Sequence, residues 1–124
     1  MAIVLLVEDE PPLLVLAESV LQEAGYETLS AATLAEAQAI IHSDKKIDLV
    51  LTDITLGVVA EGGLQVGQFV RQARSGTPVL YTTGRGITDG MIQLFVEPNA
   101  YLAKPYTHDQ LIEAVTNLLG DRKT

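Results

Sequence analysis

Acidic side chains close two apolar runs of this chain, at positions far apart in the sequence. Glu8 and Asp9 follow the run Ile3–Val7, and Asp53 follows the run Ile47–Thr52. Carboxylates held close together raise each other's pKa, and a divalent cation relieves that repulsion. Ligand sets made only of oxygen suit Mg²⁺ or Mn²⁺. These acids therefore predict a metal site if the fold brings them together.

Two more polar groups stand at the ends of later apolar runs. Thr83 closes Pro78–Thr83, and Lys104 follows Ala100–Ala103. A metal ion bound by oxygen, an ammonium group and a hydroxyl donor are the parts that hold a phosphoryl group during in-line transfer. Asp53 would then be the nucleophile and would form an aspartyl phosphate. A single acid after a strand is more often a helix cap, so this prediction depends on the clusters converging.

The elements that must position these residues alternate along the chain. Short, continuously apolar runs predict strands buried on both faces, and apolar residues at helical spacing follow each run. The predicted strands are Ile3–Val7, Tyr26–Ala31, Ile47–Thr52, Pro78–Thr83 and Ala100–Ala103. The predicted helices run from Pro11 or Pro12 to Gly25, Thr33 to about Ser43, about Gly63 to Arg74, about Ile87 to Val96, and Thr107 to Gly120. Thr33 with Glu36 and Thr107 with Gln110 are predicted capping boxes.

Strands alternating with helices predict a parallel α/β sheet covered on both faces by right-handed crossovers. Five such units in 124 residues fit the doubly wound strand order 2-1-3-4-5. In that order the first and third strands are neighbours, and ligands bind beside them at the carboxyl ends of the strands. We therefore expect Glu8, Asp9, Asp53, Thr83 and Lys104 to meet at one edge.

Composition narrows the class of protein. The chain has no cysteine, which excludes a disulfide framework and a metal site with cysteine ligands. Its net charge of −8 disfavours direct binding to nucleic acid. The opening segment MAIVLLVEDE does not resemble a signal peptide, and no apolar run is long enough to span a membrane. We expect one domain over residues 1–124 and a cytoplasmic location, with His42 and His108 on the surface.

Four segments of the chain, VLLVEDE, DLVLTDI, PVLYTTG and YLAKPY, resemble the receiver domain of two-component response regulators in order and spacing. The resemblance covers essentially the whole chain. It implies the flavodoxin-like (βα)5 fold and a phosphoacceptor switch rather than an enzyme. The activity that it implies is limited to Mg²⁺-dependent self-phosphorylation and autodephosphorylation.

The resemblance also implies roles for single residues. Asp53 resembles the phosphoacceptor and Asp9 the direct metal ligand. Glu8 resembles the neighbouring acid that acts through a metal-bound water, and the backbone carbonyl of Thr55 would be a further metal ligand. Lys104 resembles the lysine that contacts the phosphoryl group.

Two further implied roles concern conformational change. Thr83 resembles the switch hydroxyl that moves toward the phosphoryl group. Tyr101 matches the rotating aromatic of the family, with plain packing at the sheet edge as the alternative. The Lys104–Pro105 peptide bond is a candidate for the cis form, which only bonds before proline reach cheaply.

The implied partners are a sensor histidine kinase or a histidine phosphotransfer protein. A downstream protein would bind the face made by the fourth helix, fifth strand and fifth helix, and this face would change on phosphorylation. We expect a monomer or weak dimer that binds neither nucleic acid nor membrane. No DNA-binding domain follows Gly120, so we expect a single-domain regulator; a receiver excised from a larger hybrid kinase or regulator is the alternative.

The chain departs from the family pattern after Asp53. In the family this loop usually runs through Met-Pro to an Asp-Gly pair, whereas the segment Leu56–Gly63 lacks the proline and is about two residues longer. It is either a surface insertion or a mobile flap over the site. Gly57 in place of proline is expected to loosen the backbone beside the metal.

The fourth helix is a second departure, since Gly84, Gly86 and Gly90 weaken it and Pro98 limits its end. We expect a short or irregular helix. Its apolar residues should divide between the core and a partner patch. These residues are Met91, Ile92, Leu94, Phe95 and Val96.

Two other functions compete with the phosphoacceptor. A phosphatase with an aspartate nucleophile needs a second acid two residues on, and Thr55 at that position cannot be the acid. Flavin or nucleotide binding is disfavoured because the chain has no glycine-rich phosphate loop after the first strand.

A third departure from the family pattern is the pair Glu8-Asp9 in place of two aspartates, which does not count against metal binding.

Overall fold

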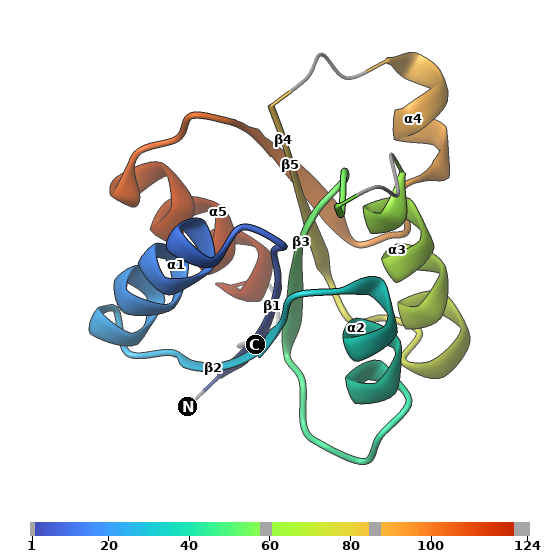
Figure 1. Ribbon diagram of the computed structural model, residues 1–124, viewed down its shortest axis with the longest axis horizontal. Helices are drawn as coiled ribbons and strands as arrows, with labels where there is room; N and C mark the ends of the chain where they lie inside the picture. The colour runs from blue at the N-terminus through green and yellow to red at the C-terminus, as the bar shows by residue number, and fades with distance from the viewer. Residues whose placement is uncertain (1, 58–60, 85–87, 121–124) are drawn as a thin grey trace.

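A computed structural model of the protein describes residues 2–57, 61–84 and 88–120. Strands and helices alternate as the sequence predicts (Figure 1). The elements are β1 (Ile3–Val7), α1 (Pro11–Glu23), β2 (Glu27–Ala31), α2 (Leu34–Ile41), β3 (Leu49–Asp53), α3 (Gly62–Ala73), β4 (Val79–Thr83), α4 (Asp89–Leu94), β5 (Asn99–Ala103) and α5 (His108–Gly120). The strands form one parallel sheet in the order β2-β1-β3-β4-β5, which confirms the predicted fold class.

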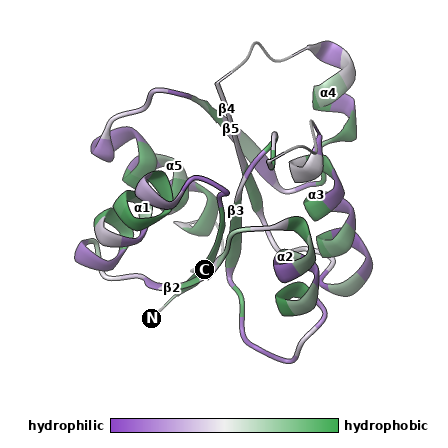
Figure 2. Cartoon of the chain, in the orientation of Figure 1, coloured by the Kyte–Doolittle hydropathy of each residue, from purple (hydrophilic) through white to green (hydrophobic). Residues whose placement is uncertain are grey.

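Helices cover both faces of this sheet, so the protein has three layers (Figure 1). Alternate residues of β1 enter different cores, because successive side chains of a strand point to opposite faces. Val4 and Leu6 pack with α1 and α5, and Leu5 and Val7 pack with α2 and α3. Figure 2 shows the central strands as largely hydrophobic, whereas the connection from β1 to α1 is hydrophilic. The acidic residues that follow β1 thus lie outside the apolar body of the sheet.

Side-chain caps begin three of the helices. Thr107 and Gln110 form the complete predicted box, because each side chain accepts a hydrogen bond from the backbone N–H of the other. Thr33 accepts from the N–H of Glu36, but the Glu36 carboxylate accepts from Ala32 rather than from Thr33. Thr88, for which the sequence pattern gave no prediction, caps α4 by accepting from the N–H of Met91.

The boundaries differ from the prediction mainly in β3 and α4. β3 begins two residues later than expected and includes Asp53 as its last residue. α4 spans six residues, which confirms a short helix. Phe95 and Val96 lie beyond its end and are buried, because Phe95 has extended backbone angles where the predicted helix would continue. No described helix has both the length and the apolar character needed to cross a membrane.

Candidate functional site

The pairing of β1 with β3 brings the acidic residues together. Val7 lies opposite Thr52 in the parallel register, so Glu8 and Asp53 follow at the same level of the sheet. Glu8, Asp9 and Asp53 each offer a carboxylate oxygen, and these oxygens lie within 4.8 Å of one another. The acids are thus neighbours because β1 and β3 are neighbours, as the predicted strand order requires.

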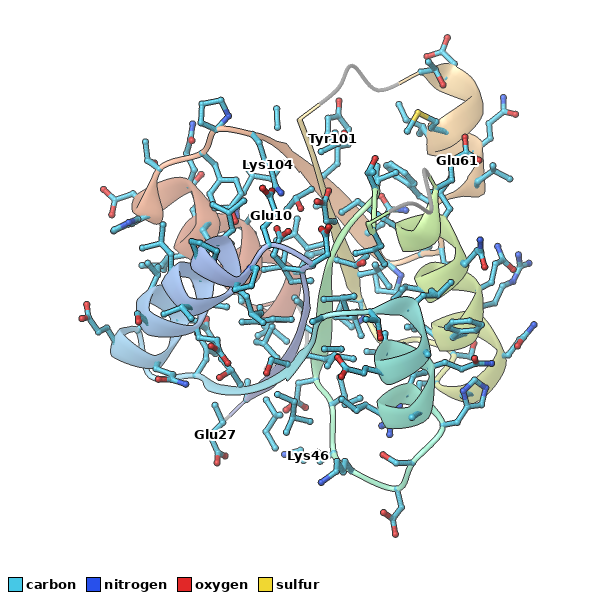
Figure 3. All side chains as sticks on the ribbon, in the orientation of Figure 1. Glu10, Glu27, Lys46, Glu61, Tyr101 and Lys104 are labelled. Atoms are coloured by element: carbon cyan, nitrogen blue, oxygen red, sulfur yellow. The ribbon has the colours of Figure 1, made fainter. Side chains whose placement is uncertain are left out.

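Lys104 extends into this cluster from the loop after β5. Its ammonium nitrogen lies 2.9 Å from Oε1 of Glu8 and 3.1 Å from Oδ2 of Asp53. The backbone N–H of Lys104 donates to the carbonyl of Thr83 at 2.8 Å, which ties the loop to the end of β4. In Figure 3, Lys104, Tyr101 and Glu10 lie at one end of the molecule, whereas Glu27 and Lys46 lie at the other. The paired charges of Lys104, Glu8 and Asp53 therefore lie at the carboxyl ends of the strands.

Burial sets the electrostatics of the two inner carboxylates. It raises the pKa of Glu8 and of Asp53, and the hydrogen bond and charge of Lys104 oppose that rise for both groups. The charge of Asp9 raises the pKa of Asp53 further. Burial alone would lower the pKa of Lys104, but its two carboxylate partners raise it above its ordinary value. One ammonium group thus contacts two of the three clustered carboxylates, so the cluster with Lys104 carries a net charge of −2 when all three acids are ionised.

The remaining predicted metal ligand, Thr55, lines a pocket of about 340 Å³ beside the cluster. Its walls include Asp9, Asp53, Thr55 and Lys104. The backbone N–H of Thr55 hydrogen-bonds the Asp53 carboxylate, which lowers the pKa of Asp53. An open pocket with oxygen donors and surplus negative charge fits a hard divalent cation that retains waters. The residues present thus suit the Mg²⁺ or Mn²⁺ that the sequence predicts.

Thr83 and Tyr101 occupy different environments. Thr83 is the last residue of β4 and is buried. Tyr101 lies in the middle of β5 with 53% of its surface exposed, and its ring centroid lies 6.3 Å from that of Phe95. The Lys104–Pro105 bond is cis as predicted, and so is Glu97–Pro98, for which the sequence pattern gave no prediction.

Two contributors to the site were not predicted from the sequence. Tyr106 is partly buried, and the charges of Lys104, Glu8 and Asp53 act on its hydroxyl group. Its place directly after Lys104-Pro105 was the available signal. Gly57 donates its backbone N–H to Oδ2 of Asp9 at 3.0 Å, which no side-chain pattern could reveal.

The segment after Asp53 is described in part. Gly57 has a φ of +58° and donates its N–H to Asp9, whereas the expected loosening of the backbone at this residue stays a prediction. The choice between surface insertion and mobile flap falls on residues 58–60, which lie outside the described residues. Residues 85–87 of the predicted fourth helix lie outside them too.

An apolar groove of about 400 Å³ adjoins the site on the α1 side. It runs between α1 and the loop from β5 to α5, with Lys104 in its wall. The other lining residues are Leu13, Leu16, Ala17, Val20, Pro105, Tyr106, His108 and Leu111. Leu13 and Leu16 are 36% and 47% exposed, so the wall of the groove presents apolar side chains to solvent. His108 and His42 are both exposed, as predicted.

Comparisons with known protein sequences place the chain in a family. Residues 4–116 match the family model described as the response regulator receiver domain. The phosphate regulon transcriptional regulatory protein PhoB of Pseudomonas aeruginosa is 30% identical over 119 residues, covering 94% of this chain and 51% of that protein. The transcriptional regulatory protein TcrA of Mycobacterium tuberculosis (H37Rv) is 34% identical over 109 residues, covering 87% and 42%. The chain thus spans about half the length of these relatives.

Solved structures agree with the sequence matches. A response regulator receiver protein from Sinorhizobium medicae superposes with a TM-score of 0.88 at 33% identity, covering 98% of this chain and 97% of that one. The response regulator TrrA of Thermotoga maritima, solved in complex with Mg²⁺-BeF, superposes with a TM-score of 0.82 at 29% identity, covering 96% and 100%. Both the fold and the order of the elements are shared.

Proposed function

The chain belongs to the response regulator receiver family, and from this premise we propose that Asp53 accepts a phosphoryl group from a sensor histidine kinase or a histidine phosphotransfer protein. One observation carries the proposal: Lys104 lies within 3.1 Å of Asp53, at the edge of a cluster of three carboxylates. Receivers are signalling switches rather than enzymes with external substrates. A cytoplasmic location and a monomer or weak dimer are part of the proposal.

The transfer forms one bond and breaks one. A carboxylate oxygen of Asp53 attacks the phosphorus of the phosphohistidine, and the P–N electron pair returns to the imidazole nitrogen. The imidazole leaves neutral when its other nitrogen already carries a proton. Attack of water on phosphorus later reverses the state, yielding inorganic phosphate and the free Asp53 carboxylate.

Several residues act on the transferred group. Lys104 donates to Oδ2 of Asp53 and would donate to a phosphoryl oxygen once Asp53 carries the acyl phosphate. Glu8, Asp9, Asp53 and the carbonyl of Thr55 would hold Mg²⁺ or Mn²⁺. When bound, the cation supplies charge neutralisation for the phosphoryl oxygens.

The switch would act through Thr83 and Tyr101. Movement of the Thr83 hydroxyl toward the phosphoryl group and inward rotation of Tyr101 would bias the surface between two conformations. Ile92, Leu94 and Tyr101 are 41%, 52% and 53% exposed on α4 and β5. This surface would bind the downstream protein in one of the two conformations.

The apolar groove beside α1 is proposed to receive the phosphodonor. A donor histidine must approach Asp53 from solvent, and this groove shares Lys104 with the site. A donor helix with apolar residues at the contact would bury Leu13 and Leu16. The same approach would leave the α4 surface free for output.

Labelling tests the proposal directly. The protein is incubated with Mg²⁺ and either acetyl phosphate or a phosphorylated kinase, and intact mass reports the phosphoryl adduct. We expect wild type and the exposed control Asp44→Asn to be labelled, and Asp53→Asn to remain unlabelled. Labelling of Asp53→Asn to the wild-type extent would overturn the assignment. Enzymic turnover of p-nitrophenyl phosphate would instead favour the phosphatase alternative, despite Thr55.

A further inference from the structure

The loops after β1 and β3 are joined by a backbone hydrogen bond. The N–H of Gly57 donates to Oδ2 of Asp9 at 3.0 Å, across 48 residues of sequence. Gly57 itself is exposed and Asp9 is partly exposed. A hydrogen bond to an ionised acceptor is stronger than one between neutral groups, so it can hold a side chain that packing alone does not.

The conformation of Gly57 makes this bond possible. Its φ of +58° lies in the left-handed region, where a residue with a β-carbon is disfavoured. Proline could supply neither that φ nor an N–H. Asparagine keeps the N–H and tolerates the left-handed region better than other residues do. The donor thus depends on the residue type at position 57.

Asp9 differs from the other two acids of the cluster in the group that holds its carboxylate. Lys104 contacts Glu8 and Asp53, but among the described ion pairs none includes Asp9. The Gly57 amide occupies one carboxylate oxygen of Asp9 and leaves the other oxygen for a cation. Outer groups that hydrogen-bond a ligating carboxylate orient it and strengthen metal binding.

We propose that Gly57 is a positioning residue of the cation site, and that its amide holds Asp9 in the orientation that binds the metal. The proposal rests on the proposed function, because that function places Mg²⁺ or Mn²⁺ at Glu8, Asp9 and Asp53. Gly57 does not touch the cation and acts through Asp9.

Mg²⁺ titration by calorimetry is the first test. Gly57→Pro removes both the donor and the φ, so its Kd for Mg²⁺ should rise about tenfold. Gly57→Asn should bind Mg²⁺ with a Kd within about twofold of the wild-type value, because asparagine keeps the N–H donor and tolerates the positive φ. Gly76→Pro is the matched control: Gly76 also has a positive φ, +95°, but it lies between α3 and β4 and does not line the pocket beside the carboxylates, so its Mg²⁺ affinity should not change. Wild-type affinity in Gly57→Pro would overturn the proposal.

The second test needs no metal. In metal-free protein the Gly57 amide proton should resonate downfield and exchange slowly, and Asp9→Ala should shift it upfield and speed its exchange. If Asp9→Ala changes neither the chemical shift nor the exchange rate of the Gly57 amide proton, the proposed hydrogen bond to Asp9 is overturned. If the wild-type protein binds no Mg²⁺, the proposed function is wrong. The Gly57 amide signal in metal-free protein still tests the hydrogen bond to Asp9 separately. If Gly57→Pro does not fold, Gly57→Ala keeps the N–H, disfavours the φ and should weaken Mg²⁺ binding to a smaller extent.

Discussion

Lys104 illustrates how a single residue sets the state of the site. Its side chain and those of Glu8 and Asp53 are each less than a fifth exposed, so their charges are only weakly screened. Burial raises the pKa of both carboxyl groups, and Lys104 offsets that effect. The lysine therefore stabilises the folded, metal-free protein in addition to its proposed contact with the phosphoryl group.

Lys104→Met tests this stabilising role. The change removes the ammonium group that pairs with the carboxylates of Glu8 and Asp53. The free energy of unfolding in the absence of metal should therefore fall by about 3 kcal/mol. Urea denaturation at neutral pH measures it. Adding Glu8→Gln to the variant should recover part of the loss, since one buried charge is then removed. A loss under about 0.5 kcal/mol, the scale of an ordinary surface substitution, would contradict the expectation.

At the scale of elements, Tyr81 joins β4 to both α3 and the segment before β5. It is fully buried, stacks on Phe95 with ring centroids 4.0 Å apart, and accepts a hydrogen bond from the N–H of Val96 at 3.0 Å. Its hydroxyl lies against Gly67 of α3, where a β-carbon would collide with it. Phe95 in turn lies near Tyr101, so this packing links the middle of β4 to the predicted switch aromatic.

Tyr81→Phe should cost about 1–3 kcal/mol at neutral pH, because it leaves the buried N–H of Val96 unpaired. Burial raises the pKa of Tyr81, so the folded protein keeps the phenol proton longer than the unfolded chain does. The stability from this difference is complete below about pH 10 and is lost as pH rises through the folded pKa. Tyr81→Phe should therefore lose stability less steeply above about pH 10, as urea denaturation across pH would show.

A double-mutant cycle is the control for this packing. Gly67→Ala should destabilise wild type but be tolerated in Tyr81→Phe, where the hydroxyl that meets the new methyl group is absent. Equal destabilisation by Gly67→Ala in both backgrounds would show that the hydroxyl contact is not responsible.

α1 provides the other element-scale prediction. Leu16→Glu places a charge in the apolar groove and should slow phosphotransfer from a histidine kinase on the order of tenfold. Labelling by acetyl phosphate should be unchanged, because the small donor needs no docking surface. Val15→Glu is the matched control, since Val15 is 59% exposed on the same helix but does not line the groove. Equal kinase-dependent rates for all three proteins would exclude the groove as the donor site.

At the scale of the whole molecule, charge acts in two ways. The excess of acidic side chains gives a net charge of −8, and these negative charges repel one another across the surface. Any salt screens that repulsion. The three clustered carboxylates concentrate negative charge at one place, where a bound divalent ion has a specific effect. Stability measurements must separate these contributions.

Mg²⁺ at about ten times its Kd should raise the free energy of unfolding by about 1.4 kcal/mol, because it binds the folded protein alone. The Tm should rise by about 5 °C. Thermal unfolding with NaCl matched in ionic strength isolates the specific effect from screening. Asp9→Asn should lose the specific part and keep the screening part. The same Mg²⁺-specific rise in Asp9→Asn would argue against the proposed ligand.

Much of the fold was predictable because each strand carries its own local signal. Ile3–Val7 and Leu49–Asp53 are buried along almost their whole length, so their continuous apolar sequence reports their place in the sheet. α4 was harder to predict because it is short. Thr88 caps its start, and Phe95, directly after its end, has extended backbone angles and is buried in the core. Apolar periodicity could not separate its helical residues from the buried residues that follow it.

The sequence by itself determined the strand order and therefore the convergence of Glu8, Asp9, Asp53 and Lys104. Residue type and alternation suffice for this, because parallel βα units have few allowed arrangements. Only the tertiary structure decided that Lys104 bridges Glu8 and Asp53, and that a backbone amide of Gly57 holds Asp9. Every residue except proline carries an N–H group, so its use depends on φ, ψ and distance rather than on residue type.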